Sequence, residues 1–269
     1  DGRAVNDCVF VRMLQRHAFE DQLIEARRLA EEANAAKAKF LSMMSHDLRT
    51  PLTTISGYAS LVAHEQFGPL TEDQRDAMQQ IQDAGTELLR MINDILAFAQ
   101  VESGRFTLRA AEVTVRSALT RAETLVRLRA EEAGLTLDFA DCDDSIAVYA
   151  DPDRLQQILL NLLTNALKFT MPGGRVSVVC EQVDERVRIR VRDTGIGIPH
   201  DQLDRVFDPF VQLEQQPEDP TQRGVGLGLA ISRDLARAMD GELTAESTPG
   251  EGSVFTVELP AVMAAVPSG

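Results

Sequence analysis

The stretch Ser45-His46-Asp47-Leu48-Arg49-Thr50-Pro51 lies inside a long amphipathic helix pattern. The apolar side of that pattern runs through Phe40, Met44, Leu48, Leu52, Ile55, Ala59 and Val62. His46 is two positions from both Met44 and Leu48, about 200° around a helix, so we expect its imidazole to face solvent. An exposed imidazole beside the Asp47 carboxylate is compatible with a proton-transfer group, a nucleophile or an ordinary surface histidine. This segment alone does not decide among them.

The helical pattern extends on both sides of this segment. Residues 13–39 are rich in Ala, Glu, Arg and Lys at the spacing of a coiled-coil linker, and Pro51 is expected to bend the helix. The capping-box sequence Thr71-x-x-Gln74 begins a second helix. Two antiparallel helices with one apolar stripe each bury those stripes when two copies form a four-helix bundle. We therefore predict that residues 13–104 are a helical-hairpin dimerisation domain.

Composition limits the class of protein. The net charge of −15, from 27 basic and 42 acidic residues, argues against nucleic acid as a partner. No apolar run is long enough to cross a bilayer, and no signal-peptide layout is present. Cys8, Cys142 and Cys180 are scattered and predict neither a disulfide framework nor a zinc site, as in a reducing cytosol. We expect a cytoplasmic chain, with any membrane anchor of the native protein outside it.

The pattern changes after residue 104. Residues 105–260 alternate between strand-like and helix-like segments and predict a mixed α/β sandwich with helices on one face of a sheet. Strands are expected at 106–108, 135–139, 146–150, 175–182, 186–193, 242–247 and 253–259, and helices at 114–133, 151–169 and 226–239. Asp151-Pro152 supplies an N-cap and a proline at the first helical position. Residues 1–12 are predicted to be a short strand stub, and residues 261–269 a tail.

The predicted helix after Asp151 carries one polar motif. Asn161, Asn165 and Lys168 fall at i, i+4 and i+7 and share one face. Two carboxamides and an ammonium suit Mg²⁺ and phosphate oxygens, although an ordinary polar face of an amphipathic helix has the same pattern.

Two glycine-bearing turns follow. Asp193-Thr-Gly-Ile-Gly197 comes directly after a strand, where a carboxylate can accept a hydrogen bond from the exocyclic amine of a base. Gly224-Val-Gly-Leu-Gly228 precedes a helix, whose free amides make an anion site, but it does not follow a strand as a dinucleotide fingerprint requires. Phe207-Asp-Pro-Phe210 is more often core packing than ligand contact. The polar residues 211–223 are expected to be a mobile lid.

Taken in this order and spacing, these motifs resemble the sensor histidine kinases of two-component signalling over residues 37–260. The resemblance implies a dimeric helical hairpin for histidine phosphotransfer, followed by a Bergerat-type ATP-binding sandwich. Residues 5–32 are similar to the last strand and exit helix of a PAS sensor module. The implied partners are a second copy of the chain, the receiver domain of a response regulator and an upstream sensor.

The resemblance also implies residue roles. His46 would be phosphorylated, Asp47 would orient or deprotonate its imidazole, and Thr50 would place water when the regulator is dephosphorylated. Asn165 would ligate Mg²⁺, and Asp193 would read the adenine amine of ATP. Other implied nucleotide-binding residues are Asn161, Lys168, Phe169, Gly195, Gly197, Phe207, Arg223, Gly224, Gly226, Leu227, Gly228 and Leu229. Arg223 is the only cation of the lid, and Phe207 and Phe210 are implied to couple the lid to the helical domain.

Three alternatives remain. ATPases of the gyrase, chaperone and mismatch-repair type resemble this chain in the ATP site but carry a Glu four residues before the Mg²⁺-binding Asn. Asn161 occupies that position here and cannot act as a general base, which favours transfer to His46. A non-catalytic dimeric scaffold is expected to have lost the His, Asn or Asp, and all three are present. A third alternative keeps the fold but makes phosphatase action the main output, which Thr50 permits.

Overall fold

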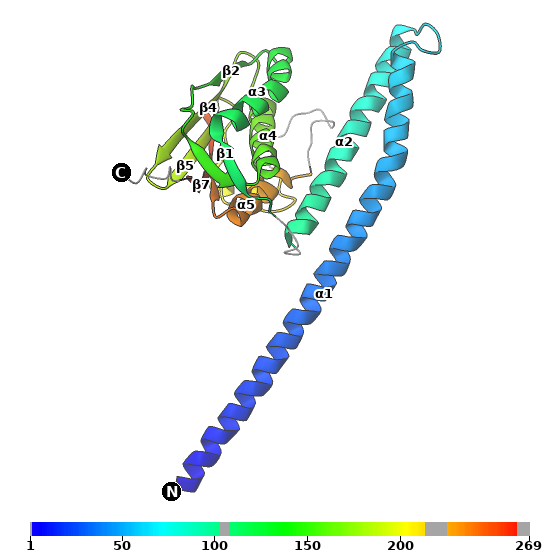
Figure 1. Ribbon diagram of the computed structural model, residues 1–269. Coiled ribbons are helices and arrows are strands. Elements are labelled where there is room, and N and C mark those ends of the chain that lie inside the picture. The colour runs from blue at the N-terminus through cyan, green and yellow to red at the C-terminus, as the bar shows by residue number, and fades with distance from the viewer. Residues whose placement is uncertain (1, 103–107, 213–224, 263–269) are drawn as a thin grey trace.

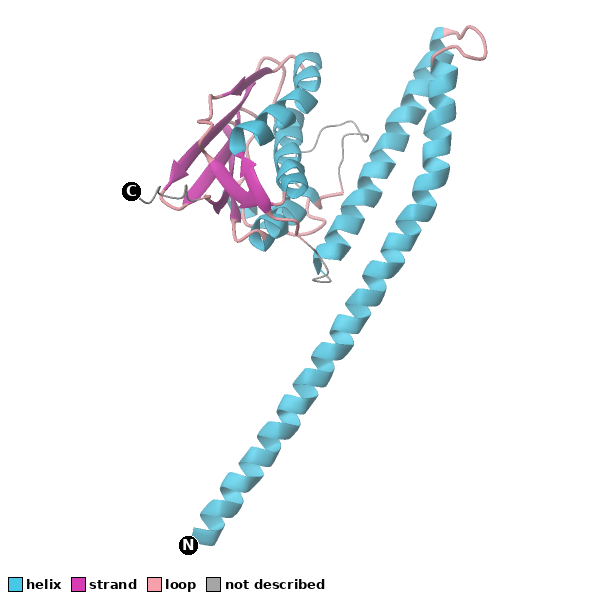
Figure 2. Cartoon of the chain, in the orientation of Figure 1, coloured by secondary structure: helices cyan, strands magenta, loops and turns pink. Residues whose placement is uncertain are grey.

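A computed structural model of the chain describes residues 2–102, 108–212 and 225–262 (Figure 1). Several side chains of the first helix, among them that of His46, lie outside the described part. The chain folds into a long helical hairpin followed by an α/β sandwich, as Figure 2 shows. Within the described residues, no helix combines the length and apolarity needed to span a membrane.

The hairpin consists of α1 (Gly2–Ala63) and α2 (Glu72–Glu102). The strand predicted within residues 1–12 is wrong, because α1 is helical from Gly2 onward. No proline separates those residues from the helix-forming stretch that follows, so the helix extends through them. The helix also continues through Pro51. The capping box is confirmed: the Thr71 N–H donates to Gln74 Oε1 at 3.0 Å, and the Gln74 N–H donates to Thr71 Oγ1 at 3.3 Å.

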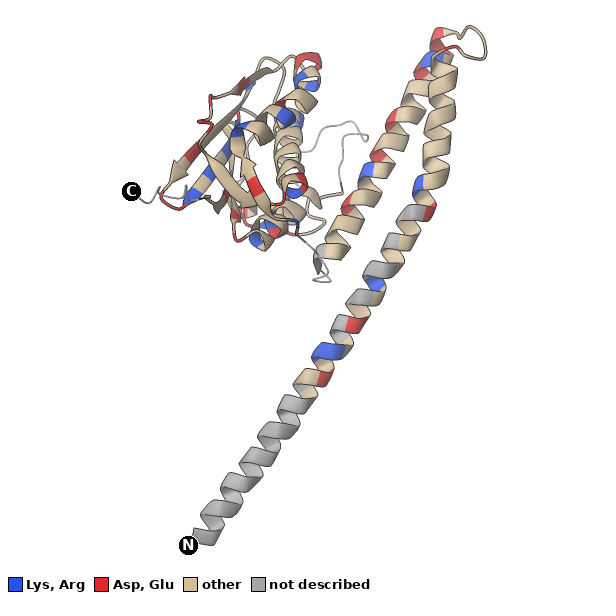
Figure 3. Ribbon diagram, viewed as in Figure 1, with Lys and Arg blue, Asp and Glu red and all other residues tan. Residues whose placement is uncertain are grey.

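The predicted apolar stripe of α1 divides into two faces. Leu52 and Ala59 are buried, as is Ile92 of α2. Phe40, Leu48 and Ile55 instead expose more than half of their surface (56%, 51% and 52%). Residues 51–63 of α1 include no Lys, Arg, Asp or Glu, and the ribbon of this part of the helix is tan in Figure 3. The single hairpin therefore leaves an apolar face uncovered, as expected of half of a four-helix bundle.

The sandwich is built on a five-stranded sheet in the order β2-β4-β5-β7-β6. Its strands are β2 (Thr136–Phe139), β4 (Arg175–Val183), β5 (Arg186–Asp193), β6 (Glu242–Thr248) and β7 (Gly252–Pro260). The β2–β4 pair is parallel, and the other pairs are antiparallel. A separate antiparallel pair joins β1 (Ala111–Thr114) to β3 (Ala147–Ala150). Apart from the strand predicted at 106–108, which largely lies outside the described residues, the predicted elements match within a few residues.

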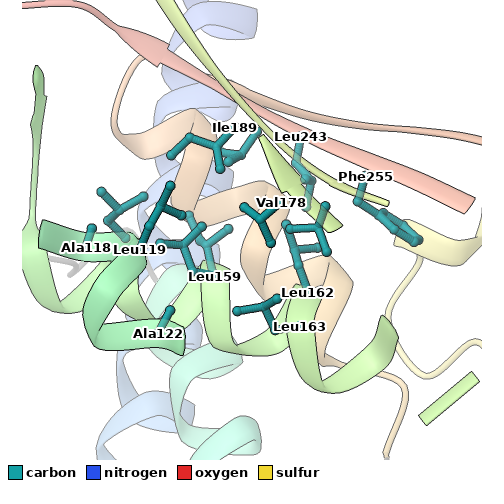
Figure 4. Packing of buried hydrophobic residues seen from close by; sticks show 14 of the residues in the cluster. Ala118, Leu119, Ala122, Leu159, Leu162, Leu163, Val178, Ile189, Leu243 and Phe255 are labelled. Atoms are coloured by element: carbon teal, nitrogen blue, oxygen red, sulfur yellow. The ribbon is translucent and has the colours of Figure 1, made fainter. Parts of the chain in front are cut away.

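Helices α3 (Val115–Glu132), α4 (Pro152–Phe169) and α5 (Gly228–Ala238) supply the helical layer. Figure 4 shows apolar side chains of α3 and α4 meeting those of the sheet: Ala118, Leu119, Ala122, Leu159, Leu162 and Leu163 against Val178, Ile189, Leu243 and Phe255. The predicted cap of α4 is confirmed, since the Asp151 side chain accepts hydrogen bonds from the N–H groups of Asp153 and Arg154. Full burial of a leucine contributes about 2 kcal/mol, so this layer fixes the polar face of α4 firmly.

The cysteine prediction requires correction. Cys142 and Cys180 form a disulfide, with their Cα atoms 5.8 Å apart. They lie 38 residues apart in sequence, which concealed the pairing. The parallel pairing of Phe139 in β2 with Val178 in β4 places the chain after β2 beside Cys180.

Candidate functional site

A pocket that is open to solvent lies between the sandwich and α2. Its walls come from α4, the turn after β5, the start of α5, strand β7 and helix α2. Many of the residues predicted to bind a nucleotide line it: Asn161, Asn165, Lys168, Phe169, Asp193, Gly197, Gly226, Leu227, Gly228 and Leu229. The fold therefore brings the separate sequence motifs together at one cavity.

Asp193 is the last residue of β5, and its side chain is buried. Its Oδ1 accepts hydrogen bonds from the N–H groups of Gly195 at 2.8 Å and Ser253 at 3.2 Å. Burial raises the pKa of Asp193 above its ordinary value, and the two backbone hydrogen bonds act in the opposite direction. Among the described residues, donors reach only Oδ1, so Oδ2 remains an acceptor for a ligand in the pocket. Gly195 itself contributes through this hydrogen bond and not as a lining residue.

Asn161 joins two walls of the pocket. Its Nδ2 donates to Ser232 Oγ of α5 at 2.9 Å. A Cβ at position 228 would collide with the Asn161 side chain, so Gly228 is needed for α5 to approach α4 this closely. The amide of Asn161 is therefore partly committed to positioning α5.

Helix α5 offers backbone donors to the same cavity. It begins at Gly228 without a side-chain cap, and Gly228 and Leu229 line the pocket. The first N–H groups of a helix have no partner within the helix and carry its positive dipole end. The start of α5 is therefore suited to an anion.

Lys168 is a half-buried cation of the pocket wall. Its Nζ lies 4.8 Å from the centroid of the Phe169 ring. Burial lowers the pKa of Lys168, and the positive charge of Arg90 lowers it further. Arg90 and Asp94, both on α2, also line the pocket. The sequence motifs gave no signal for these two residues, because their role depends on how the hairpin lies against the sandwich.

The two phenylalanines occupy different surroundings. Phe207 does not line the pocket formed by the described residues, and its role in nucleotide binding stays a prediction; the guanidinium of Arg233 lies 4.8 Å over its ring. Phe210 packs edge-to-face on Phe98 of α2, with ring centroids 5.9 Å apart. The Phe210 N–H donates to the Gly226 carbonyl at 2.9 Å, so the turn that contacts the hairpin is bonded to the glycine-rich segment. Arg223 and Gly224 lie outside the described residues.

Helix α2 connects the segment around His46 to the pocket. Asp47 and Thr50 are exposed on α1, whereas the His46 side chain lies outside the described part. Arg49 Nη2 donates to Asn93 Oδ1 at 2.8 Å. Asn93 lies between Arg90 and Asp94 in the sequence, so one turn of α2 contacts both the His46 segment and the pocket.

Comparisons with known proteins assign both parts of this arrangement. Residues 36–104 match the family of the His Kinase A (phospho-acceptor) domain. Residues 150–263 match the family of histidine kinase-, DNA gyrase B- and HSP90-like ATPases. The second description also names gyrase- and HSP90-like ATPases, whereas the first names the phospho-acceptor domain of histidine kinases.

Individual proteins similar to this chain are also histidine kinases. The chain is 42% identical over 252 residues to the circadian input-output histidine kinase CikA of Synechococcus elongatus, covering 93% of this chain and 33% of that protein. It is 38% identical to the histidine protein kinase DivJ of Caulobacter vibrioides, covering 95% of this chain and 42% of that protein. The structure of full-length ShkA in complex with AMPPNP matches with a TM-score of 0.69 and 35% identity, covering 85% of this chain and 47% of that one. The chain thus spans less than half the length of these relatives.

The two domain families, the similar proteins and the similar structure all indicate the same protein family. The chain belongs to the sensor histidine kinases, and its hairpin and ATP-binding sandwich form a histidine kinase catalytic core.

Proposed function

We propose that the pocket binds ATP with Mg²⁺ and that the γ-phosphoryl group is transferred to His46, then to an aspartate on the receiver domain of a response regulator. The observation that carries this proposal is that Asp193, Asn165 on the polar face of α4 and the start of α5 all line one pocket. Helix α2 contacts both that pocket and the His46 segment. The AMPPNP in the ShkA structure supports an adenine nucleotide here.

The donor atoms of the pocket fit the two ends of Mg²⁺-ATP. Asp193 Oδ2 is an acceptor for the adenine amine, and Lys168 with the start of α5 supplies positive charge for phosphates. The Asn165 carboxamide provides one oxygen for Mg²⁺. No cluster of three or more acidic, His or Cys side chains suited to a metal occurs in the described part of the chain. Such a donor set fits Mg²⁺, which at nucleotide sites takes most of its ligands from phosphates and water. When bound, Mg²⁺ neutralises phosphate charge during transfer.

The transfer requires an imidazole nitrogen without a proton. That nitrogen of His46 donates its electron pair to the γ-phosphorus, the bond to the β–γ bridging oxygen breaks, and ADP leaves with that pair. Asp47 accepts a hydrogen bond from the other ring N–H, which raises the basicity of the imidazole. An aspartate oxygen of the regulator then takes the phosphoryl group from nitrogen, and His46 is restored.

The assembled protein is proposed to be a homodimer under the control of an upstream sensor. The uncovered apolar face of α1 supports pairing of two hairpins. Phosphatase action on the regulator, with Thr50 placing water, is a second proposed output; the exposure of Thr50 beside the His46 segment favours it.

The alternative function, ATP hydrolysis as in the gyrase- and chaperone-type ATPases, has less support. The Asn161 amide is bonded to Ser232, and a carboxamide does not act as a general base toward water. The non-catalytic scaffold is expected to have lost Asn165 or Asp193, and both of these residues line the pocket.

The test is chemical. Incubated with Mg²⁺ and γ-labelled ATP, the chain should take up an acid-labile, base-stable label, and His46→Gln should abolish it. A label that survives this substitution would place the acceptor elsewhere. Thr50→Ala is the matched variant on the same helix, and it should retain the label.

A further inference from the structure

Helix α2 contributes one cation to the nucleotide pocket. Arg90 and Asp94 are one helical turn apart, and both line the cavity, although every nucleotide-binding motif of the sequence lies in the sandwich. Arg90 is therefore in position to contact a ligand bound in the pocket.

Glu87, which does not line the pocket, orients the guanidinium of Arg90. Nε donates to Glu87 Oε2 at 2.8 Å, and Nη2 donates to Glu87 Oε1 at 2.5 Å. Glu87 does not line the cavity, whereas Asp94 does. The remaining contact runs from Nη1 to Asp94 Oδ2 and is longer, at 3.2 Å. Glu87 thus fixes the plane of the guanidinium while Nη1 is held loosely on the pocket side.

Arg90 and Lys168 place two cations from different domains at one cavity. The charge of Arg90 contributes to the lowered pKa of Lys168, which shows that the two groups interact unfavourably, with Glu87 acting in the opposite direction. Asp94 lies at the same wall, and burial raises the pKa of its carboxyl group. The phosphates of a nucleotide carry more negative charge than this single carboxylate, so they can compete with Asp94 for the guanidinium.

We propose that Arg90 binds the phosphates of the nucleotide, with Nη1 exchanging Asp94 for a phosphate oxygen while Glu87 keeps the guanidinium in place. This inference rests on the proposed ATP site and extends it. It makes the hairpin part of the nucleotide site, so a triphosphate binds more tightly when α2 lies against the sandwich.

The test compares the affinity of the full chain for ATP with its affinity for adenosine. Arg90→Ala should weaken ATP binding about tenfold, the loss of one charge-assisted hydrogen bond, and leave adenosine binding within about twofold. Asp94→Asn should strengthen ATP binding, because it removes the competing charge. Arg75→Ala is the matched control on α2, since Arg75 pairs with Glu65 at the hairpin turn and does not line the pocket.

Other outcomes overturn the proposal in distinguishable ways. Unchanged ATP affinity in Arg90→Ala, with weakened binding in Asp193→Asn and Asn165→Ala, would refute the role of Arg90 and leave the ATP site intact. Equal losses for ATP and adenosine would show that Arg90 acts only through packing. Unchanged affinity in all three variants would refute the ATP site itself.

Discussion

Replacing Asp193 by Asn tests the base-recognition end of the pocket with little disturbance of the fold. The Asn carbonyl oxygen can take the place of Oδ1 and keep accepting the N–H groups of Gly195 and Ser253. The amide nitrogen then replaces Oδ2, the atom left for the ligand. A donor would face the adenine amine, which is also a donor, so the variant loses a hydrogen bond that a charged acceptor makes in the parent chain.

The magnitude follows from that single hydrogen bond. A hydrogen bond to a charged group contributes about 1.5–3 kcal/mol, so Asp193→Asn should weaken ATP binding roughly 10- to 100-fold. Isothermal titration of ATP into the full chain measures this loss. Asp204→Asn is a suitable control, because Asp204 is exposed and lies outside the pocket lining. Affinity within twofold of the parent would refute the assignment of Asp193.

Asp193→Asn, which weakens ATP binding, should not lower the stability of the nucleotide-free protein. The folded pKa of Asp193 is raised, so the folded state holds this proton more tightly than the unfolded chain, and stability falls as the pH rises through the folded pKa. At neutral pH the ionised group therefore opposes folding, and Asp193→Asn should unfold at an equal or higher urea concentration. ATP affinity of the parent should fall as the pH drops through that pKa, and the variant should lack this dependence. A clear loss of stability would show that the substitution damages the fold.

Three further predictions concern the scaffold. Reduction of the Cys142–Cys180 disulfide, which closes a separation of 38 residues, should lower the free energy of unfolding by about 4 kcal/mol, and a variant with both cysteines replaced by serine should not respond to reductant in urea unfolding. Phe98→Ala and Phe210→Ala should show a coupling energy of about 0.5–1.5 kcal/mol in a double-mutant cycle of thermal stability, whereas additive effects would contradict their contact. Thr71→Ala should cost about 1 kcal/mol in chemical unfolding and Thr71→Ser much less, because only the hydroxyl caps α2.

Local signals predicted most of the fold because they act over a few residues. Asp151 and Pro152 begin α4 where an N-cap and a first-turn proline were expected, and Thr71 and Gln74 cap α2 reciprocally. The nucleotide-binding motifs were found for the same reason, since the polar face of α4 and the turn after Asp193 are each encoded by a short stretch of sequence. Their convergence on one pocket depends on how α4 and α5 pack against the sheet.

Features that depend on contacts between distant segments were missed. The Cys142–Cys180 disulfide follows from the pairing of β2 with β4, which no spacing in the sequence reveals. Arg90 reaches the pocket only because α2 lies against the sandwich. The apolar stripe of α1 was predicted as one surface, but a neighbouring helix covers Leu52 and leaves Leu48 exposed.

The fate of the γ-phosphoryl group tests the central claim most directly. Chain incubated with Mg²⁺-ATP is analysed at alkaline pH for phosphohistidine at residue 46 and, in the same sample, for free inorganic phosphate. We predict phosphohistidine at His46, formed one-for-one with ADP in the first turnover and absent from Asn165→Ala. ATP consumed to inorganic phosphate with His46 unmodified would contradict the account and identify the chain as a hydrolase.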